Sequence, residues 1–319
     1  MRRLPLWASL IPLIVGLAIY WFYWDRQRDA FEAALVPLFG DGVAVGGFPY
    51  RLEGEIVAPR LRHDGQYALD VRADSALVNR QPWRDSLTLV RLIEPWLQWR
   101  APGLAVGFDV ASRTAQASVR LDGDRLVRLS SVHQTAELRL PFVGMPATAA
   151  SFEWHFRETP AAPDPASRAP TFPEQAQLVL GADALRVGGG DPLKLTAQIG
   201  LTSAAPIWDL ASWRGGGTVE LRRLTLADDV GDVVTVIATG SASRAAPLRL
   251  IGTIETVCPF TLQAAFAGTP APAHELRTRK PMRFGFGGTA GNIELLLPAG
   301  GQRRLPVRAQ ELPCPKLVG

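Results

Sequence analysis

The chain has 319 residues, of which 47 % are hydrophobic and 20 % are charged. This apolar content is enough to bury a sizeable core, so disorder over most of the length is excluded. The formal net charge of +4 comes almost entirely from arginine, and no stretch forms a basic stripe of the kind that binds nucleic acid. The 30 glycines and 26 prolines lie mostly between short apolar runs, a distribution typical of an all-β chain.

The N-terminal segment is the strongest feature of the sequence. From Leu4 to Trp24 no charged side chain occurs, and a helix of this length spans roughly 30 Å, the thickness of a bilayer core. The aromatic cluster at residues 20–24 suits the bilayer interface. The sequence therefore predicts a transmembrane helix over residues 4–24, with a cleaved signal peptide or a buried core helix as the alternatives.

The charges that flank this segment predict its orientation. Arg2 and Arg3 precede it, whereas the acidic and basic residues that follow it roughly cancel. By the positive-inside rule, residues 1–3 are expected in the cytoplasm and the bulk of the chain in the periplasm. Cys258 and Cys314 suit such an oxidising compartment and are candidates for one disulfide. The sequence leaves open whether they are bonded, because their distance in space is unknown.

Residues 25–40 are predicted to continue the helix beyond the bilayer as an amphipathic stalk. Apolar side chains recur there at helical spacing, and Gly40 ends the pattern. A stalk that packs on the domain it carries is favoured over a helix that binds a partner. Its expected apolar face consists of Phe31, Ala34, Leu35, Leu38 and Phe39.

After Gly42 the apolar period changes from 3.6 to 2, which indicates antiparallel strands in a first β unit over residues 41–157. In "FEWHF", Phe152, Trp154 and Phe156 alternate with polar residues. The stretch "GFPYRL", residues 47–52, is read as a strand that begins near Pro49 and has Phe48, Tyr50 and Leu52 on one side.

A proline-rich segment over residues 158–173 is predicted to be a linker or a long loop, and a second β unit follows over residues 174–319. Both units contain glycine turns followed by long alternating strands. One sheet through both halves and two separate sheets remain alternatives. The predicted fold is mainly β, with one or more large curved antiparallel sheets that are sandwich-like or leave an open groove.

Enzymatic chemistry finds little support in the sequence. "GFGGTA", residues 285–290, fits a dinucleotide-binding pattern, but the short run "NIELLLP" follows instead of the required helix. No nucleophile elbow or calcium loop occurs. The histidines are isolated from one another and form no local metal site: they are His63, His133, His155 and His274.

Tryptophans in "EPWLQW" and "WDLASW" are expected in single helical turns or in loops at a sheet edge. These are Trp96, Trp99, Trp208 and Trp213. Two roles remain open for them: they fill the core, where a buried tryptophan contributes a large apolar area, or they form a rim that contacts lipid or a partner.

The order of these elements resembles a family of uncharacterised alphaproteobacterial envelope proteins, a domain of unknown function. Its members share an N-terminal anchor, an early Gly-aromatic-Pro-aromatic-Arg-Leu strand, here "GFPYRL", and many later alternating strands. The resemblance extends to about Val257, and the cysteine-containing tail does not fit it. More loosely, the single anchor and long sheets look similar to the AsmA-like envelope proteins, whose apolar grooves are thought to hold lipid. These resemblances imply a location and a shape, but no catalytic residue.

We therefore expect a non-enzymatic, inner-membrane-anchored periplasmic β-protein that binds or transfers lipid or another hydrophobic ligand. The alternative is a structural or assembly factor that holds other envelope proteins, and a hydrolase is a weaker third reading. No cofactor, metal or nucleic acid is expected; the expected partners are the membrane, lipid and other envelope proteins. The candidate ligand-binding residues, all of which could equally be core, are Phe48, Tyr50, Leu52, Phe152, Trp154 and Phe156.

Overall fold

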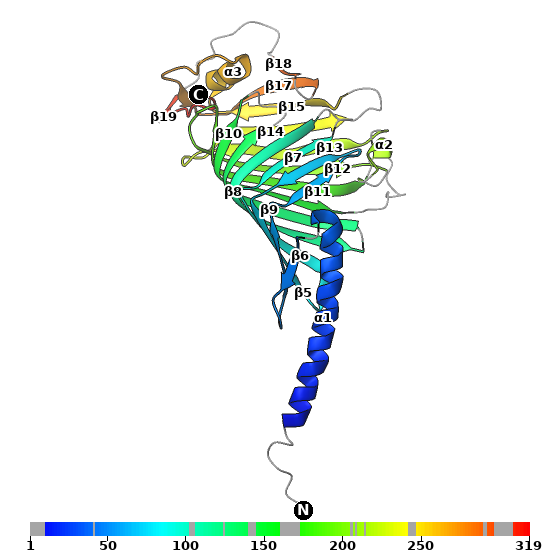
Figure 1. Cartoon of the computed structure of the whole chain (residues 1–319). Coiled ribbons are helices and arrows are strands. Elements are labelled where there is room, and N and C mark those ends of the chain that lie inside the picture. Colours follow the sequence, from blue (N-terminus) through cyan, green and yellow to red (C-terminus); the bar gives the residue numbers. More distant parts are fainter. Residues whose placement is uncertain are drawn as a thin grey trace, which may run out of the picture.

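The protein is dominated by one large antiparallel sheet. The computed structural model describes residues 10–40, 42–101, 106–123, 125–139, 145–159, 173–204, 207, 209–213, 215–241, 247–289, 292–296 and 309–319. Within these residues, 17 strands form the main sheet and two more form a small second sheet. The main sheet is strongly curved, and the start of α1 and the C-terminus lie at opposite ends of the molecule (Figure 1).

The helices are α1 (Ile11–Phe39), α2 (Leu210–Trp213) and α3 (Pro259–Ala267). The strands before the proline-rich segment are β1 (Ala44–Gly46), β2 (Leu52–Val57), β3 (Arg60–His63), β4 (Ala68–Arg72), β5 (Ser75–Gln81), β6 (Arg84–Ile93), β7 (Trp96–Ala101), β8 (Val106–Asp122), β9 (Arg125–Arg139) and β10 (Ala147–Glu158). The strands after it are β11 (Glu174–Val187), β12 (Leu193–Thr202), β13 (Thr218–Ala227), β14 (Asp232–Ser241), β15 (Arg249–Thr256), β16 (Leu276–Thr278), β17 (Met282–Thr289), β18 (Asn292–Leu296) and β19 (Ala309–Pro313).

One sheet runs through both halves of the chain, which is one of the two arrangements that the sequence left open. From β8 to β15 each strand pairs with the next, and β17 and β18 extend this order. The proline-rich segment falls between β10 and β11, which pair over Ala147–Glu158. Residues 160–172 of that segment lie outside the described residues.

A line of backbone irregularities, which we call the crease, crosses the first half of the sheet. Four non-glycine residues on it, Ala58, Glu94, Thr135 and Ala184, have φ values of 48°, 47°, 54° and 51°. Such values are uncommon for residues with a Cβ, and they bend the strand that carries them. Ala58 lies between β2 and β3, and Glu94 lies between β6 and β7. Beyond the crease the chain therefore continues as a separate group of short strands. We call β3, β4 and β7 the flap.

The flap is joined to the main sheet through β8. The first half of β8 pairs with β7, and its second half pairs with β6. Strand β7 then pairs with β4, and β4 with β3. The long strand β8 therefore belongs to both parts, and the sheet divides there.

Helix α1 covers one end of the sheet and packs against β2. Its buried side chains, Trp24, Phe31 and Leu35, form a core with Leu52 and Ile56 of β2 and with residues of β5 and β6. The side chains of α1 pack so closely on β2 that a Cβ added to Gly54 would lie 2.9 Å from Leu35 Cδ1. Of the expected apolar face over residues 25–40, Phe31, Leu35 and Phe39 pack onto the sheet, whereas Ala34 and Leu38 are exposed.

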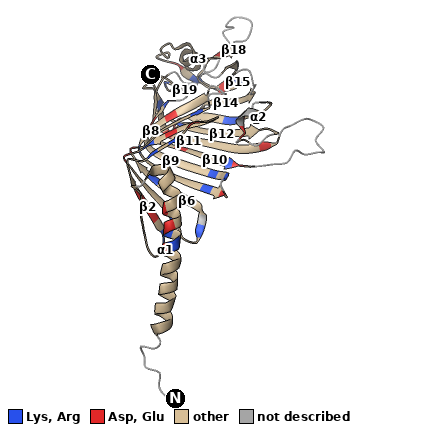
Figure 2. Ribbon diagram, turned by 45° about the vertical axis from the view of Figure 1, so that its right-hand side comes forward, with Lys and Arg blue, Asp and Glu red and all other residues tan. Residues whose placement is uncertain are grey.

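The first turns of α1 project away from the sheet (Figure 1). Figure 2 shows that this part of the helix carries no Lys, Arg, Asp or Glu. Its large apolar side chains are exposed, among them Leu13, Ile14, Leu17 and Ile19. No helix among the described residues combines the length and the apolar character that crossing a membrane requires. The predicted span over residues 4–24 lies partly outside the described residues, which begin at Leu10.

The C-terminal part of the chain covers the other end of the sheet. Leu262 of α3 and Leu317 of the tail lie in one buried core with residues of β12, β14, β15 and β17. Cys258, at the N-cap of α3, and Cys314, directly after β19, form a disulfide. The carboxylate of Glu275 accepts hydrogen bonds from the backbone N–H groups of Phe260 and Thr261 at 2.9 and 2.6 Å, so it caps α3.

The glycines of "GFGGTA" lie within strand β17, and β18 begins at Asn292. Gly288 has a φ of 150°, and a Cβ there would lie 2.0 Å from the carbonyl oxygen of Asn292. Gly288 therefore serves close strand packing. Ala290 lies outside the described residues.

Candidate functional site

We call the face of the sheet that carries Phe152, Trp154 and Phe156 the inner face. The α1 core and the α3 core both lie on it, because their strand residues share this face through the strand register. The opposite, outer face carries polar side chains at most positions, as Glu153 and His155 illustrate on β10. The inner face is thus the more apolar of the two, as expected for half-buried antiparallel strands, although the outer face also exposes Val179, Ile237 and Ile251.

The strand register aligns inner-face side chains from neighbouring strands into one apolar row. Leu129 lies opposite Val119 and Phe156, Leu178 lies opposite Phe156 and Ile199, and Leu221 continues the line. All six side chains are half-buried rather than fully buried. We call this set the apolar row: Val119, Leu129, Phe156, Leu178, Ile199 and Leu221.

The apolar row lies between the buried cores. One core lies under α1, one under α3, and a third along the crease around Phe152 and Leu195. In the described parts of the chain, none of these cores includes Val119, Leu129, Leu178 or Ile199. The middle of the inner face therefore keeps apolar surface that the fold itself does not fully cover.

A series of aromatic rings leads from the flap to the main sheet. The ring centroids of Tyr67 and Trp99 lie 6.0 Å apart, those of Trp99 and Phe108 5.6 Å, and those of Phe108 and Trp154 6.4 Å. Tyr67 Oη donates a hydrogen bond of 2.9 Å to the carbonyl oxygen of Ile207. Burial, and then the negative charge of Asp209, raises the pKa of Tyr67 to about 12, so its hydroxyl stays neutral.

A small polar cluster is embedded in the apolar surroundings of the inner face. His133 is 2 % exposed, and its Nδ1 lies 3.1 Å from Ser112 Oγ. Its Nε2 lies 3.0 Å from Ser131 Oγ and 3.4 Å from Trp154 Nε1. Burial lowers the pKa of His133 to about 4, so the imidazole is neutral near neutral pH. The cluster satisfies a buried polar group, and no acidic side chain takes part in these contacts.

The structure separates the six predicted ligand-binding residues into three groups: three lie on the inner face, one lies under α1, and two lie in a turn before β2. Trp154 and Phe156 are half-buried on the inner face, and Phe152 is buried beside them. Leu52 is fully buried under α1 and is part of that core.

The prediction of a strand over "GFPYRL" is wrong for residues 47–51, and β2 begins only at Leu52. Phe48 and Tyr50 lie in a turn before β2, and they are 46 % and 75 % exposed. The turn forms because Gly47 adopts a φ of 99°, and the N–H of Arg51 donates to the carbonyl oxygen of Gly47 at 3.2 Å. Pro49, which has no N–H, cannot extend the ladder of β2.

Several inner-face residues were not identified from the sequence. Leu178 and Ile199 belong to alternating stretches, but alternation alone does not distinguish them from core. Trp96 and Trp99 lie on β7, where the strand pairs with β4 and β8, and not in a helical turn or loop. Trp213 ends the short helix α2 and is buried, whereas Trp208 lies outside the described residues.

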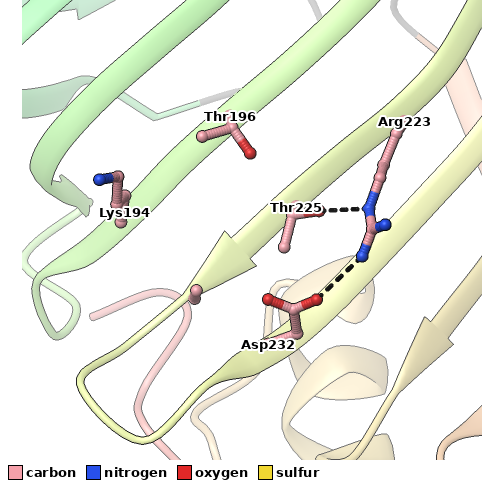
Figure 3. Close-up of a pocket in the computed structure, with 6 residues that line it drawn as sticks. Lys194, Thr196, Arg223, Thr225 and Asp232 are labelled. Atoms are coloured by element: carbon pink, nitrogen blue, oxygen red, sulfur yellow. Dashed lines mark hydrogen bonds and ion pairs between the residues drawn. The ribbon is translucent and has the colours of Figure 1, made fainter.

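A shallow polar hollow of ≈ 270 Å³ lies on β12, β13 and the start of β14 (Figure 3). Arg223 donates to Thr225 Oγ1 at 3.2 Å and to Asp232 Oδ2 at 3.1 Å, and Lys194 Nζ lies 3.9 Å from Asp183 Oδ1. Each charged side chain of the hollow thus has a charged partner, which leaves little to attract a ligand. No group of three or more His, Cys, Asp or Glu side chains that could hold a metal occurs among the described residues.

Comparisons with known proteins give a family and no further relative. No curated protein matches the chain, and no solved structure matches it either. Residues 40–311 match the family described as "Uncharacterized protein conserved in bacteria" (DUF2125), a range that runs from the end of α1 into β19. Because this match covers most of the sequence, the chain belongs to the DUF2125 family of bacterial proteins.

Proposed function

We propose that this protein is a non-enzymatic, membrane-anchored protein of the cell envelope that binds lipid, or another hydrophobic ligand, along the inner face of its sheet. The observation that carries the proposal is the apolar row, six register-aligned side chains that remain half-buried between the cores. An elongated apolar ligand fits such a row better than a compact one, because each strand contributes one side chain along the line.

The energy available from this surface supports weak binding of an acyl chain. Each buried methylene contributes about 0.8 kcal/mol, so an acyl chain that buries about ten of them gains about 8 kcal/mol. Association costs at least about 4 kcal/mol in lost translational and rotational freedom. The remainder corresponds to weak binding by the row alone. The aromatic rings of Trp99, Phe108 and Trp154 add further contact area from the flap side.

The proposed location is the inner membrane, with a single pass, the N-terminus in the cytoplasm and the bulk of the chain in the periplasm. The uncharged run from Leu4 to Trp24 and the exposed apolar side chains at the start of α1 support an anchor. Arg2 and Arg3 support the orientation. The disulfide between Cys258 and Cys314 is consistent with an oxidising compartment.

Native mass spectrometry of the full chain, extracted in a mild detergent, tests the binding proposal. We expect lipid adducts on the wild-type protein and their loss in Leu178→Asp, which places a charge in the apolar row. Val179→Asp is the matched control, because Val179 is the next residue on β11 and points to the outer face at 40 % exposure. Ile199→Ser provides a milder second variant if Leu178→Asp does not fold.

Two results would contradict the proposal. A folded wild-type protein that stays free of adducts after incubation with membrane lipid would show that the row is not a binding surface. Equal loss of lipid in Leu178→Asp and Val179→Asp would place the bound lipid elsewhere. A stoichiometric protein partner in place of lipid would favour the alternative of an assembly factor.

A further inference from the structure

Two turns of the β-domain are tied to α1 at the level of residues 20–24. Tyr20 Oη donates to the carbonyl oxygen of Pro49, and Trp24 Nε1 donates to that of Arg51 at 3.1 Å. Tyr23 Oη donates to the carbonyl oxygen of Pro82 at 2.9 Å, in the turn between β5 and β6. Both turns are thereby fixed beside the same short stretch of helix.

Large aromatic side chains gather at this level and are exposed. Tyr50 is 75 % exposed and Trp83, next to Pro82, is 56 % exposed. The Phe48 ring lies between α1 side chains, with its centroid 6.1 Å from that of Tyr20 and 5.4 Å from that of Trp24. We call the exposed set the aromatic collar: Trp21, Phe22, Tyr23, Phe48, Tyr50 and Trp83.

The collar lies at the boundary between an apolar and a charged part of α1. On its N-terminal side the helix exposes apolar residues such as Ile14 and Ile19. On its C-terminal side the charged residues begin with Asp25 and Arg26. Tryptophan and tyrosine concentrate where a bilayer core meets its headgroups, since one part of each side chain is apolar and the other is polar. Arg84, which is exposed, lies beside the collar and suits anionic headgroups, whereas Arg51 is paired with Glu53 at 2.7 Å.

We propose that the aromatic collar is a second membrane contact, in which Tyr50 and Trp83 of the β-domain enter the headgroup region of the leaflet from which α1 emerges. This inference rests on the proposed membrane anchor and adds to it a fixed orientation of the sheet. The domain lies with the β5–β6 turn against the bilayer instead of standing off on a stalk. The end of the inner face under α1 then adjoins the membrane surface.

The test uses the full chain, labelled with 5-fluorotryptophan, in nanodiscs that contain phosphatidylethanolamine, phosphatidylglycerol and a lipid with a gadolinium chelate on its headgroup. Trp83→Phe, Trp21→Phe and Trp96→Phe assign the three fluorine resonances. Trp96 is the matched control, because it lies on the flap, where its ring packs 4.2 Å from the Arg72 guanidinium carbon. We expect the gadolinium lipid to broaden the Trp83 resonance several-fold more than the Trp96 resonance and to a similar extent as that of Trp21.

The possible failures are distinguishable. If Trp21 broadens and Trp83 broadens no more than Trp96, the anchor stands and the collar contact is wrong. If neither Trp21 nor Trp83 broadens, or the protein does not enter the nanodiscs, the proposed anchor itself fails. A Trp83 resonance that shifts with protein concentration and not with gadolinium lipid would assign the collar to a second copy of the chain and overturn the membrane contact.

Discussion

Acidification is expected to destabilise this protein through His133, the buried imidazole on the inner face. Trp154 Nε1–H can only donate, and it points at Nε2 of His133 at 3.4 Å. Nε2 must therefore accept, and Nδ1–H donates to Ser112 Oγ at 3.1 Å. Protonation would place a second N–H opposite that of Trp154 and a positive charge among apolar neighbours such as Phe152.

The pKa of His133 gives the size and the sign of the effect. Burial lowers this pKa from 6.5 to about 4, so between these values the unfolded chain binds a proton that the folded chain excludes. The contribution of the neutral imidazole to stability is complete above pH 6.5 and falls as the pH drops towards 4. At about 1.4 kcal/mol per pH unit, the loss amounts to about 2.5 kcal/mol at pH 4.5.

The measurement is urea unfolding of the full chain in detergent micelles, followed by tryptophan fluorescence between pH 7 and pH 4.5. The variant His133→Gln keeps a polar side chain but cannot be protonated, so the difference in unfolding free energy between it and the wild type should shrink by about 2.5 kcal/mol on acidification. His274→Gln, at an exposed position, is the matched control for loss of an imidazole. A difference between His133→Gln and wild type that is the same at both pH values would refute the reasoning.

Two further changes test the ends of the sheet. Gly54→Val should displace α1 and lower the unfolding free energy by about 1–3 kcal/mol, because even a Cβ there lies 2.9 Å from Leu35 Cδ1. Gly46→Val is the matched control, because no atom lies within 4 Å of a Cβ added there. It should lower the unfolding free energy by less in the same urea titration. Replacing Cys258 and Cys314 together by serine opens a loop with a sequence separation of 56 residues, which should cost about 4 kcal/mol. Hydrogen exchange should show the lost protection first in α3, and unchanged protection there would contradict a structural role for the bond.

Local patterns in the sequence predicted the strands and the continuous helix, because these depend on period and on a few terminating residues. The alternation of "FEWHF" puts Phe152, Trp154 and Phe156 on one face of β10, as found. Gly40, with a φ of 82°, ends α1 where the apolar helical pattern stops. The same approach failed at Phe48 and Tyr50, since alternation does not show that Gly47 turns the chain.

The composition of the inner face could not be predicted, because it depends on pairing between distant strands and on the crease. Thr135 and Ala184 take left-handed backbone angles without being glycine, asparagine or aspartate, so no residue type marks the bend. The bend changes the alternation on β10: Ala149 and Phe152, three positions apart, share one buried core. The apolar row likewise depends on the registers of successive strand pairs, which a single sequence does not reveal.

Helix α1 carries the proposed anchor and also covers one end of the sheet. This limits how the β-domain can be released from the membrane. A protease that cut after Gly40 would remove Trp24, Phe31 and Leu35 from a core that they share with Leu52 and Ile56. The freed domain would then expose Leu52 and Ile56 at a cost of about 1.5–3 kcal/mol for each side chain. The uncovered apolar patch would favour aggregation. A soluble form would need its cut before Tyr20, so that the covering helix stays with the sheet. Cleavage is therefore poorly suited to liberating the domain, and a shortened chain for solution work should keep the whole second half of α1.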